Sequence, residues 1–152
     1  MRKRNSLRAA IILACVALLT SSPASAQADK PAARDSMAIQ NCIKAKTGRH
    51  WNWEHCIGIV SEPCAKDEGS MTPSQVIACY AREEAVWDDI LNESFRRLRD
   101  VLEAEQVGKL REMQRAWIVS RDKNCDFLYD YFQGTMANPM IAACLSRATG
   151  IS

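Results

Sequence analysis

Two pairs of acidic residues, Glu83-Glu84 and Asp88-Asp89, are the first candidates for chemistry in this sequence. The pairs lie about one helical turn apart, and paired carboxylates can divide the roles of general acid and general base. On a helix, however, a run of acidic residues is more often a solvated face. We therefore expect these carboxylates to lie in solvent and to have no catalytic role.

The two histidines, His50 and His55, are candidates for metal ligands beside Trp51 and Trp53. Their spacing does not align them on one face of a helix, and no further imidazole exists to complete a metal site. We expect neither a metal nor another cofactor. The segment is expected to form an exposed or half-packed aromatic loop whose tryptophans pack against the rest of the domain.

Residues 1–26 have the three parts of a secretory signal peptide. A basic start is followed by the apolar run Ala9–Leu19 and by the small-residue cleavage site Ala24-Ser25-Ala26. The run is too short to be a stable membrane anchor. We expect cleavage after Ala26 and a periplasmic or secreted product, and we prefer this interpretation to a lipoprotein modified at Cys15.

Removal of the signal peptide changes the charge of the chain. The full sequence has 20 basic and 18 acidic residues. The signal peptide contains four of the basic residues and none of the acidic ones, which leaves a mature net charge of −2. We therefore expect no nucleic-acid partner, since such proteins have a basic footprint, and a basic protein is the better electrostatic match.

The elements that position these side chains are expected to be helices. Residues 27–36 are expected to form a disordered leader, and residues 37–152 a single helical domain. The segment Thr72-Pro73-Ser74-Gln75 has the capping-box pattern and begins a long amphipathic helix that runs to about Glu105. Gln106-Val107-Gly108 is the expected reversal, and a second long helix follows to about Phe132.

A shorter third helix is expected at the C-terminal end. The glycine in Gln133-Gly134-Thr135 ends the second long helix, and Asn138-Pro139 begins a third that reaches about Ala148. Two short helical segments between Met37 and Val60 form an N-terminal cap. Because no run alternates with period two for long, we expect an all-α fold built on an antiparallel helical hairpin.

The mature chain keeps six cysteines, an even number that predicts disulfides in an exported protein. Paired cysteines on antiparallel neighbours lie equally far from the turn that joins them, because their Cα atoms must approach within about 7 Å. Three pairings have midpoints at expected turns: Cys42 with Cys56 at Arg49, Cys64 with Cys79 at Met71-Thr72, and Cys125 with Cys144 at Gly134-Thr135. The main rival, Cys79 with Cys125, is centred on Leu102, inside the first long helix, and is rejected for that reason.

The stretch LREMQRAWIVSRDKNC, from Leu110 to Cys125, places Gln114 and Arg121 on an otherwise apolar helical stripe. Trp117 and Ile118 on this stripe are expected to be core residues. We expect Arg121 to reach Asp88, Asn92 or Glu84 across the hairpin and to tie the two long helices together. Gln114 is expected to form a hydrogen bond across the same seam.

The same stretch carries a family resemblance. Together with Trp87–Phe95 (WDDILNESF), Gln133-Gly134-Thr135 and Cys144, it resembles the bacterial domain family named after the lysozyme inhibitor LprI, over about residues 56–149. Phe95 stands where this family commonly has tyrosine. The positions that match the family motifs are Asp88, Leu91, Asn92, Gln114, Arg115, Trp117, Arg121, Asp122 and Cys125, with Cys64, Cys79 and Cys144 as the other core cysteines.

The resemblance implies an exported binding protein that inhibits a lysozyme-type muramidase by occluding its substrate cleft. The alternative is a cell-envelope interaction protein with another partner and no inhibitory activity. We expect no enzyme, because no base, nucleophile or metal constellation is present. Candidate partner-binding residues are Arg49, His50 and Trp51 in one loop, the loop 133–138, and Arg115 and Asp122, which flank the apolar stripe.

Overall fold

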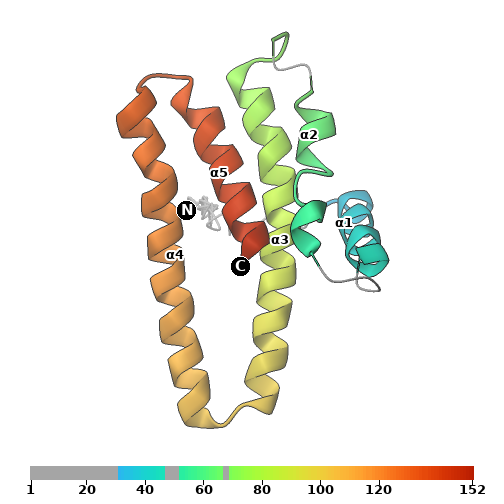
Figure 1. Cartoon of the computed structure of the whole chain (residues 1–152), viewed down its shortest axis with the longest axis vertical. Coiled ribbons are helices and arrows are strands. Elements are labelled where there is room, and N and C mark those ends of the chain that lie inside the picture. The colour runs from blue at the N-terminus through green and yellow to red at the C-terminus, as the bar shows by residue number, and fades with distance from the viewer. Residues whose placement is uncertain (1–30, 47–51, 67–68) are drawn as a thin grey trace, which may run out of the picture.

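The structure, a computed structural model, describes residues 31–46, 52–66 and 69–152. These residues form helices and no strand, which confirms the all-α expectation (Figure 1). The elements are α1 (Ala33–Lys46), a 3-10 helix η1 (Trp53–Cys56), α2 (Ser61–Cys64), α3 (Pro73–Val101), α4 (Ala104–Phe132) and α5 (Ala137–Ile151). None of the described helices combines the length and apolar character needed to span a membrane.

Helix α3 begins as its capping box predicts. The Thr72 hydroxyl accepts a hydrogen bond from the Gln75 backbone N–H, and the Gln75 side chain accepts one from the Thr72 N–H at 2.8 Å. Pro73 occupies the first turn, where a backbone N–H has no helical partner. The threonine, proline and glutamine thus fix the start of α3, one of the two 29-residue helices.

The reversal between α3 and α4 comes earlier than the sequence predicted. Helix α3 ends at Val101, Leu102 is extended, and α4 begins at Ala104, so Gly108 lies inside α4. The Gln106 side chain accepts the Glu103 backbone N–H at 3.1 Å, which gives α4 a capping interaction at its start. The prediction of a turn at Gln106-Val107-Gly108 was wrong because a glycine can sit inside a helix at modest cost.

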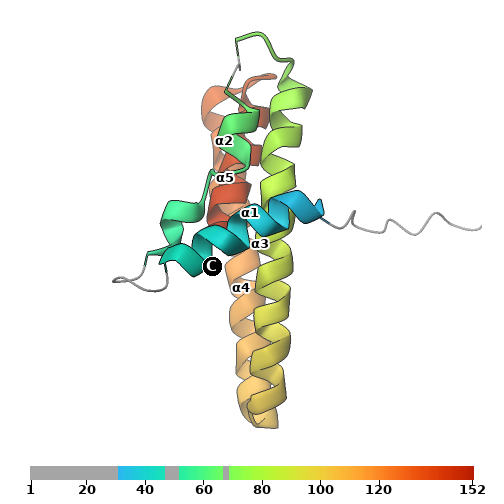
Figure 2. The ribbon, with the colours of Figure 1, turned by 90° about the vertical axis from the view of Figure 1, so that its right-hand side faces the viewer.

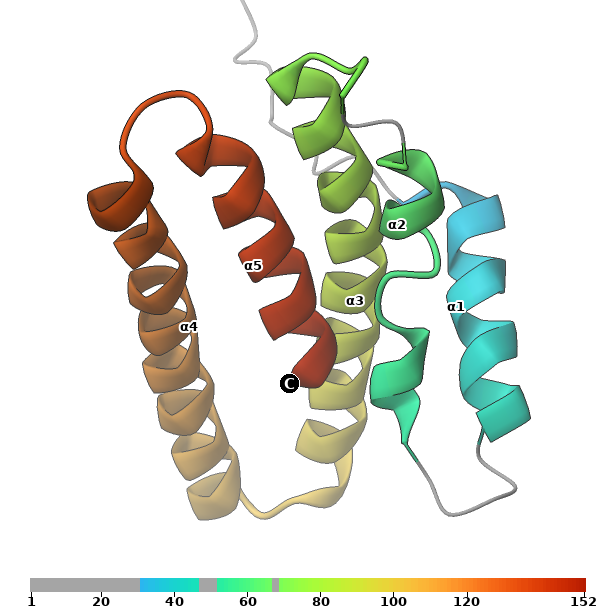
Figure 3. The ribbon, with the colours of Figure 1, turned by 45° about the horizontal axis from the view of Figure 1, so that its top comes forward.

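Helix α5 lies between α3 and α4 in the upper part of the molecule (Figures 1 and 3). It packs against both long helices, and the expected direct seam between α3 and α4 is replaced here by two seams with α5. The helix also runs on past the expected end at Ala148 to Ile151. Below its end, α3 and α4 continue alone to their shared turn.

The three disulfides are those that the turn positions predicted. Cys42–Cys56 joins α1 to η1, Cys64–Cys79 joins α2 to α3, and Cys125–Cys144 joins α4 to α5, with Cα separations of 5.8, 5.5 and 5.6 Å. The reason for rejecting Cys79–Cys125 was nevertheless wrong, because its midpoint, Leu102, is at the real reversal. What keeps those two cysteines apart is the insertion of α5 between their helices.

Helix α1 crosses α3 near its middle (Figure 2) and begins inside the segment expected to be a disordered leader. Its residue Asp35 is buried and accepts hydrogen bonds from Nε and Nη2 of Arg82 on α3, at 3.0 and 2.8 Å. Ile39 of α1 packs with Cys56, Val86 and Trp87 in the main core. The leader therefore ends before Ala33, and α1 is an integral part of the folded domain.

The Asp35–Arg82 pair predicts a pH dependence of stability. Hydrogen bonds from Arg82, and then its charge, lower the pKa of Asp35 below its usual value. A lowered folded-state pKa stabilises the protein above the unfolded-state pKa of about 4, and this contribution is lost as the pH falls through the lower folded-state pKa. We expect Asp35→Asn to cost about 1–2 kcal/mol at pH 7 and much less near pH 3, measured by urea unfolding. An equal cost at both pH values would contradict this account.

Gly150 makes the close approach of α5 to η1 and α3 possible. A Cβ at this position would lie 2.9 Å from Cγ1 of Ile57 and 3.2 Å from Cε2 of Trp87. The Gly150 carbonyl also accepts a hydrogen bond from Nε1 of Trp53 at 3.1 Å. This contact confirms that Trp53 packs against the domain.

We expect Gly150→Ala to lower the free energy of unfolding by about 1–3 kcal/mol through overpacking, as measured by urea unfolding. The matched control is Gly108→Ala, because a Cβ at Gly108 meets no atom within 4 Å. The control should stabilise α4 by about 0.5–1 kcal/mol. If both variants were equally stable, the close packing at Gly150 would not be a constraint on the fold.

Candidate functional site

The acidic pairs were expected to form a solvated face, but Glu83 is fully buried. Its carboxylate accepts four hydrogen bonds. Oε1 binds the Gly58 N–H at 2.5 Å and Nε1 of Trp87 at 3.1 Å, and Oε2 binds the N–H groups of Val60 and Ser61 at 3.0 and 2.7 Å. Glu83 thus holds the segment that leads into α2 against α3, and its oxygens are occupied by the fold rather than aimed at a substrate.

The turn that brings these amides to Glu83 depends on Gly58. Its φ of +97° lies in the left-handed region that L side chains rarely adopt. The turn lets successive backbone N–H groups converge on one carboxylate, an arrangement suited to anions. Sequence reasoning missed this site, although a glycine in an apolar run after Cys56 and a glutamate among apolar residues of α3 were visible signals.

The other acidic residues are more accessible. Burial raises the pKa of Glu84, Arg121 lowers it, and the nearby carboxylates Asp88 and Asp122 raise it further. Asp88 and Asp89 are exposed, and Asp88 accepts a hydrogen bond from Asn92 of the next turn at 2.9 Å. The pairs are therefore split between one buried structural carboxylate and three groups at or near the surface.

Arg121 joins α4 to α5 by hydrogen bonds, and the predicted direct bond to Asp88, Asn92 or Glu84 of α3 is not formed, although the charge of Arg121 does act on Glu84. Its Nε and Nη2 donate to Asp122 Oδ1 at 2.9 and 2.7 Å, and Nη1 donates to Thr149 Oγ1 at 3.2 Å. Its guanidinium carbon lies 5.2 Å from the ring centre of Trp117, at cation–π distance. Because α5 stands between the long helices, Thr149 rather than Asp88 or Asn92 receives this side chain.

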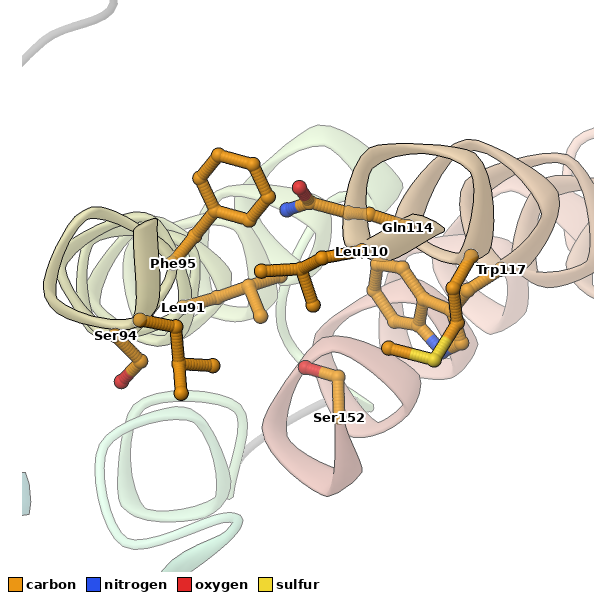
Figure 4. Close-up of a pocket in the computed structure, with 9 residues that line it drawn as sticks. Leu91, Ser94, Phe95, Leu110, Gln114, Trp117 and Ser152 are labelled. Atoms are coloured by element: carbon orange, nitrogen blue, oxygen red, sulfur yellow. The ribbon is translucent and has the colours of Figure 1, made fainter. Parts of the chain in front are cut away.

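Below the end of α5, the two long helices border a half-open hollow of about 350 Å³, which we call the hairpin cavity. Figure 4 shows Leu91 and Phe95 of α3 facing Leu110, Gln114 and Trp117 of α4 across this space. It is lined by Leu91, Ser94, Phe95, Leu98, Leu110, Met113, Gln114, Trp117 and Ser152. Leu110, Gln114 and Trp117 of the stripe thus line an apolar hollow instead of a closed seam, whereas Ile118 and Arg121 do not line it.

Gln114 does not make the expected hydrogen bond across the hairpin to any residue that the structure describes. Its amide extends toward the ring of Phe95 in Figure 4, and a phenylalanine has no hydroxyl with which to pair. Leu91 and Trp117 are half-buried, as residues at the edge of such a hollow must be. Ile118, expected in the core, is 38% exposed on α4 because α5 covers another side of that helix.

A second cavity of about 310 Å³ adjoins the first around the C-terminal end of α5. The two share Leu91, Ser94 and Ser152, and the second extends to Ile43, Trp53 and Trp87. None of the residues that line either cavity is acidic or basic. These hollows can receive apolar groups, but they offer no charged side chain for acid–base chemistry.

Of the residues expected to bind a partner, the structure places only Arg115, Asp122 and the loop 133–138. Arg49, His50 and Trp51 lie outside the described residues. Arg115 is exposed on α4, whereas Asp122 is half-exposed and paired with Arg121. The loop after α4 contains Gln133 and Gly134, both with positive φ, and confirms the expected end of that helix. The six cysteines of the described residues are all in disulfides, and these residues contain no group of His, Cys, Asp and Glu that could hold a metal ion.

Comparison with known proteins adds one finding to this geometry. The sequence model of a protein family described as Lysozyme inhibitor LprI matches residues 64–150. The matched span contains α3, α4 and α5 as far as Gly150, together with the disulfides Cys64–Cys79 and Cys125–Cys144. No curated protein and no solved structure matches the chain. The resemblance inferred from the sequence motifs is confirmed over this span.

Proposed function

The chain belongs to the family of the lysozyme inhibitor LprI, and we propose on this basis that it is an exported binding protein that inhibits a lysozyme-type muramidase. The observation that carries the proposal is the family match, which spans every long helix of the fold. We further propose that inhibition occurs by occlusion of the substrate cleft. A rigid, disulfide-tied helical body suits this role because it loses little conformational freedom on binding.

Two further observations support the proposal. Three disulfides are typical of proteins that fold in an oxidising compartment, and residues 1–26 have the features of a signal peptide. Export would bring the protein to the compartment in which muramidases act on the cell wall. The mature net charge of −2 favours encounter with a basic enzyme, as many lysozymes are.

Binding, rather than catalysis, fits the chemistry of the described side chains. Glu83 is saturated by hydrogen bonds, Arg121 is held by Asp122 and Thr149, and the cysteines are bonded to one another. The side chains with the most hydrogen bonds or covalent links therefore stabilise the fold. Exposed side chains and the apolar hollows remain available for function, and exposed side chains are what protein–protein interfaces are made of.

The test is the rate at which lysozymes of several classes clear a suspension of bacterial cell walls. We expect the purified, oxidised mature protein to slow clearance by at least one class in a saturable manner. The same protein after reduction and alkylation is the control and should have no effect. Unchanged clearance by every class at large excess would overturn the proposal, and specific binding of an envelope protein unrelated to muramidases would favour the alternative function.

A further inference from the structure

One side of α4 has no cover from the rest of the fold. Helix α5 and, beyond it, α3 lie on one side of α4, and no other described helix lies on the opposite side (Figure 1). Large apolar side chains are nevertheless exposed near its C-terminal end. They are Phe127, Tyr129, Tyr131, Phe132 and Met136, with exposed fractions of 62, 51, 72, 46 and 65%. Such a concentration of exposed aromatic residues is a common mark of an interaction surface.

Helix geometry gathers part of this set into one patch. Cys125 points to α5, since it is bonded to Cys144 and fully buried. At 100° per residue, Asp126, Phe127, Asp130 and Tyr131 fall on the side of α4 away from that disulfide. Phe127 and Tyr131 lie one turn apart, and so do Asp126 and Asp130. The two rings are therefore neighbours, and the two carboxylates lie beside them. We call these four residues the outer patch.

The charge around the outer patch is mainly negative, although the exposed Lys123 lies on the same side of α4, one turn before Phe127. Asp126 and Asp130 are exposed, and they are the only charged residues between Lys123 and Arg147 in the sequence. The patch therefore combines two carboxylates with two aromatic rings, and one basic side chain, Lys123, adjoins it, so the net charge of this surface is negative. The hairpin cavity differs from it, because no charged residue lines that cavity.

We propose that the outer patch is the surface with which this protein binds a basic muramidase, an inference that rests on the function proposed above. Phe127 and Tyr131 pack against apolar surface at the edge of the enzyme's cleft, where aromatic anchors supply most of the binding energy. Asp126 and Asp130 accept hydrogen bonds from lysine and arginine side chains of the enzyme and speed association. The hydroxyl of Tyr131 remains available for a polar contact at the rim.

The test is binding of variants to a muramidase that the wild type inhibits, measured by calorimetry and by association rate at two salt concentrations. We expect the Phe127→Ala/Tyr131→Ala double variant to raise Kd at least tenfold. Asp130→Lys should slow association about tenfold at low salt and less at high salt. The matched controls are Asp100→Lys, an exposed carboxylate near the hairpin turn, and Met113→Ala, an exposed residue that lines the hairpin cavity. Both controls should stay within twofold of the wild type.

The outcomes separate this inference from the function on which it rests. If the wild type inhibits and the outer-patch variants bind equally well, the inference is overturned and the proposed function stands. Loss of binding in Met113→Ala alone would assign the interface to the hairpin cavity instead. A wild-type dimer that Tyr131→Ala dissolves would assign the patch to a second copy of the chain. If the wild type inhibits no muramidase, the function and the inference fall together.

Discussion

Replacing Glu83 with glutamine is expected to lower the free energy of unfolding by about 3–5 kcal/mol, the range typical for disruption of a buried, hydrogen-bonded charge. The wild-type carboxylate accepts from three backbone N–H groups and from the Trp87 indole, with two donors on each oxygen. A glutamine side chain has nearly the same shape, but its NH2 group would face two of these donors. At least two buried N–H groups would then lose their acceptor.

Chemical unfolding with the disulfides intact measures this effect. Glu84→Gln is the matched control, since it makes the same change one residue along α3. Burial raises the pKa of Glu84, so its ionised form opposes folding at neutral pH and the control should be neutral or slightly stabilising. If Glu83→Gln were as stable as Glu84→Gln, the carboxylate would not be the tie between α3 and the segment before α2.

The second large effect is expected from removal of the Cys125–Cys144 disulfide by serine substitution at both positions. The two cysteines are 19 residues apart in the sequence. Without the disulfide the unfolded chain gains conformational freedom, which should lower the free energy of unfolding by about 3 kcal/mol. The native state should also loosen locally, because the contacts of α4 with other helices are concentrated on α5. Hydrogen exchange should therefore show faster exchange along α4 than global destabilisation alone would give.

A double variant that removes Cys42–Cys56 isolates this local effect. Its sequence separation of 14 predicts a similar global loss of stability, but it joins α1 to η1, far along the chain from α4. The amides of α4 should exchange more slowly in this control than in the Cys125/Cys144 variant. Equal exchange rates in the two variants would show that α4 does not depend on its disulfide to α5.

Local signals in the sequence predicted the helices and the disulfides. The Thr72–Gln75 capping box, the glycine at 134 and the positions of cysteines around turns each involve residues close together in the chain. Such features are set by backbone hydrogen bonding and loop geometry, which a sequence records directly. The reversal at Leu102 was missed because glutamate at 103 is a less common N-cap than serine or aspartate.

The partners of polar side chains were harder to predict, because they depend on how helices pack. Nothing local to Arg121 indicates that α5 separates α3 from α4 and presents Thr149 to it. The burial of Glu83 likewise depends on Gly58, distant in the sequence, which turns its backbone toward α3. The exposure of Phe127 and Tyr131 follows from the same packing, since α5 covers only one side of α4. Candidate binding residues chosen from sequence alone therefore differed from those of the outer patch.

Inhibition of the muramidase itself is tested most directly with a soluble oligosaccharide substrate rather than whole cell walls. With a soluble substrate, a fall in rate must come from an effect on the muramidase, since no cell-wall surface is present for the protein to cover. We predict that the initial rate falls toward zero as the oxidised protein approaches one equivalent of a susceptible enzyme, and that excess substrate relieves the inhibition. A rate that stays constant at large excess of the protein, for every lysozyme class tested, would contradict the account.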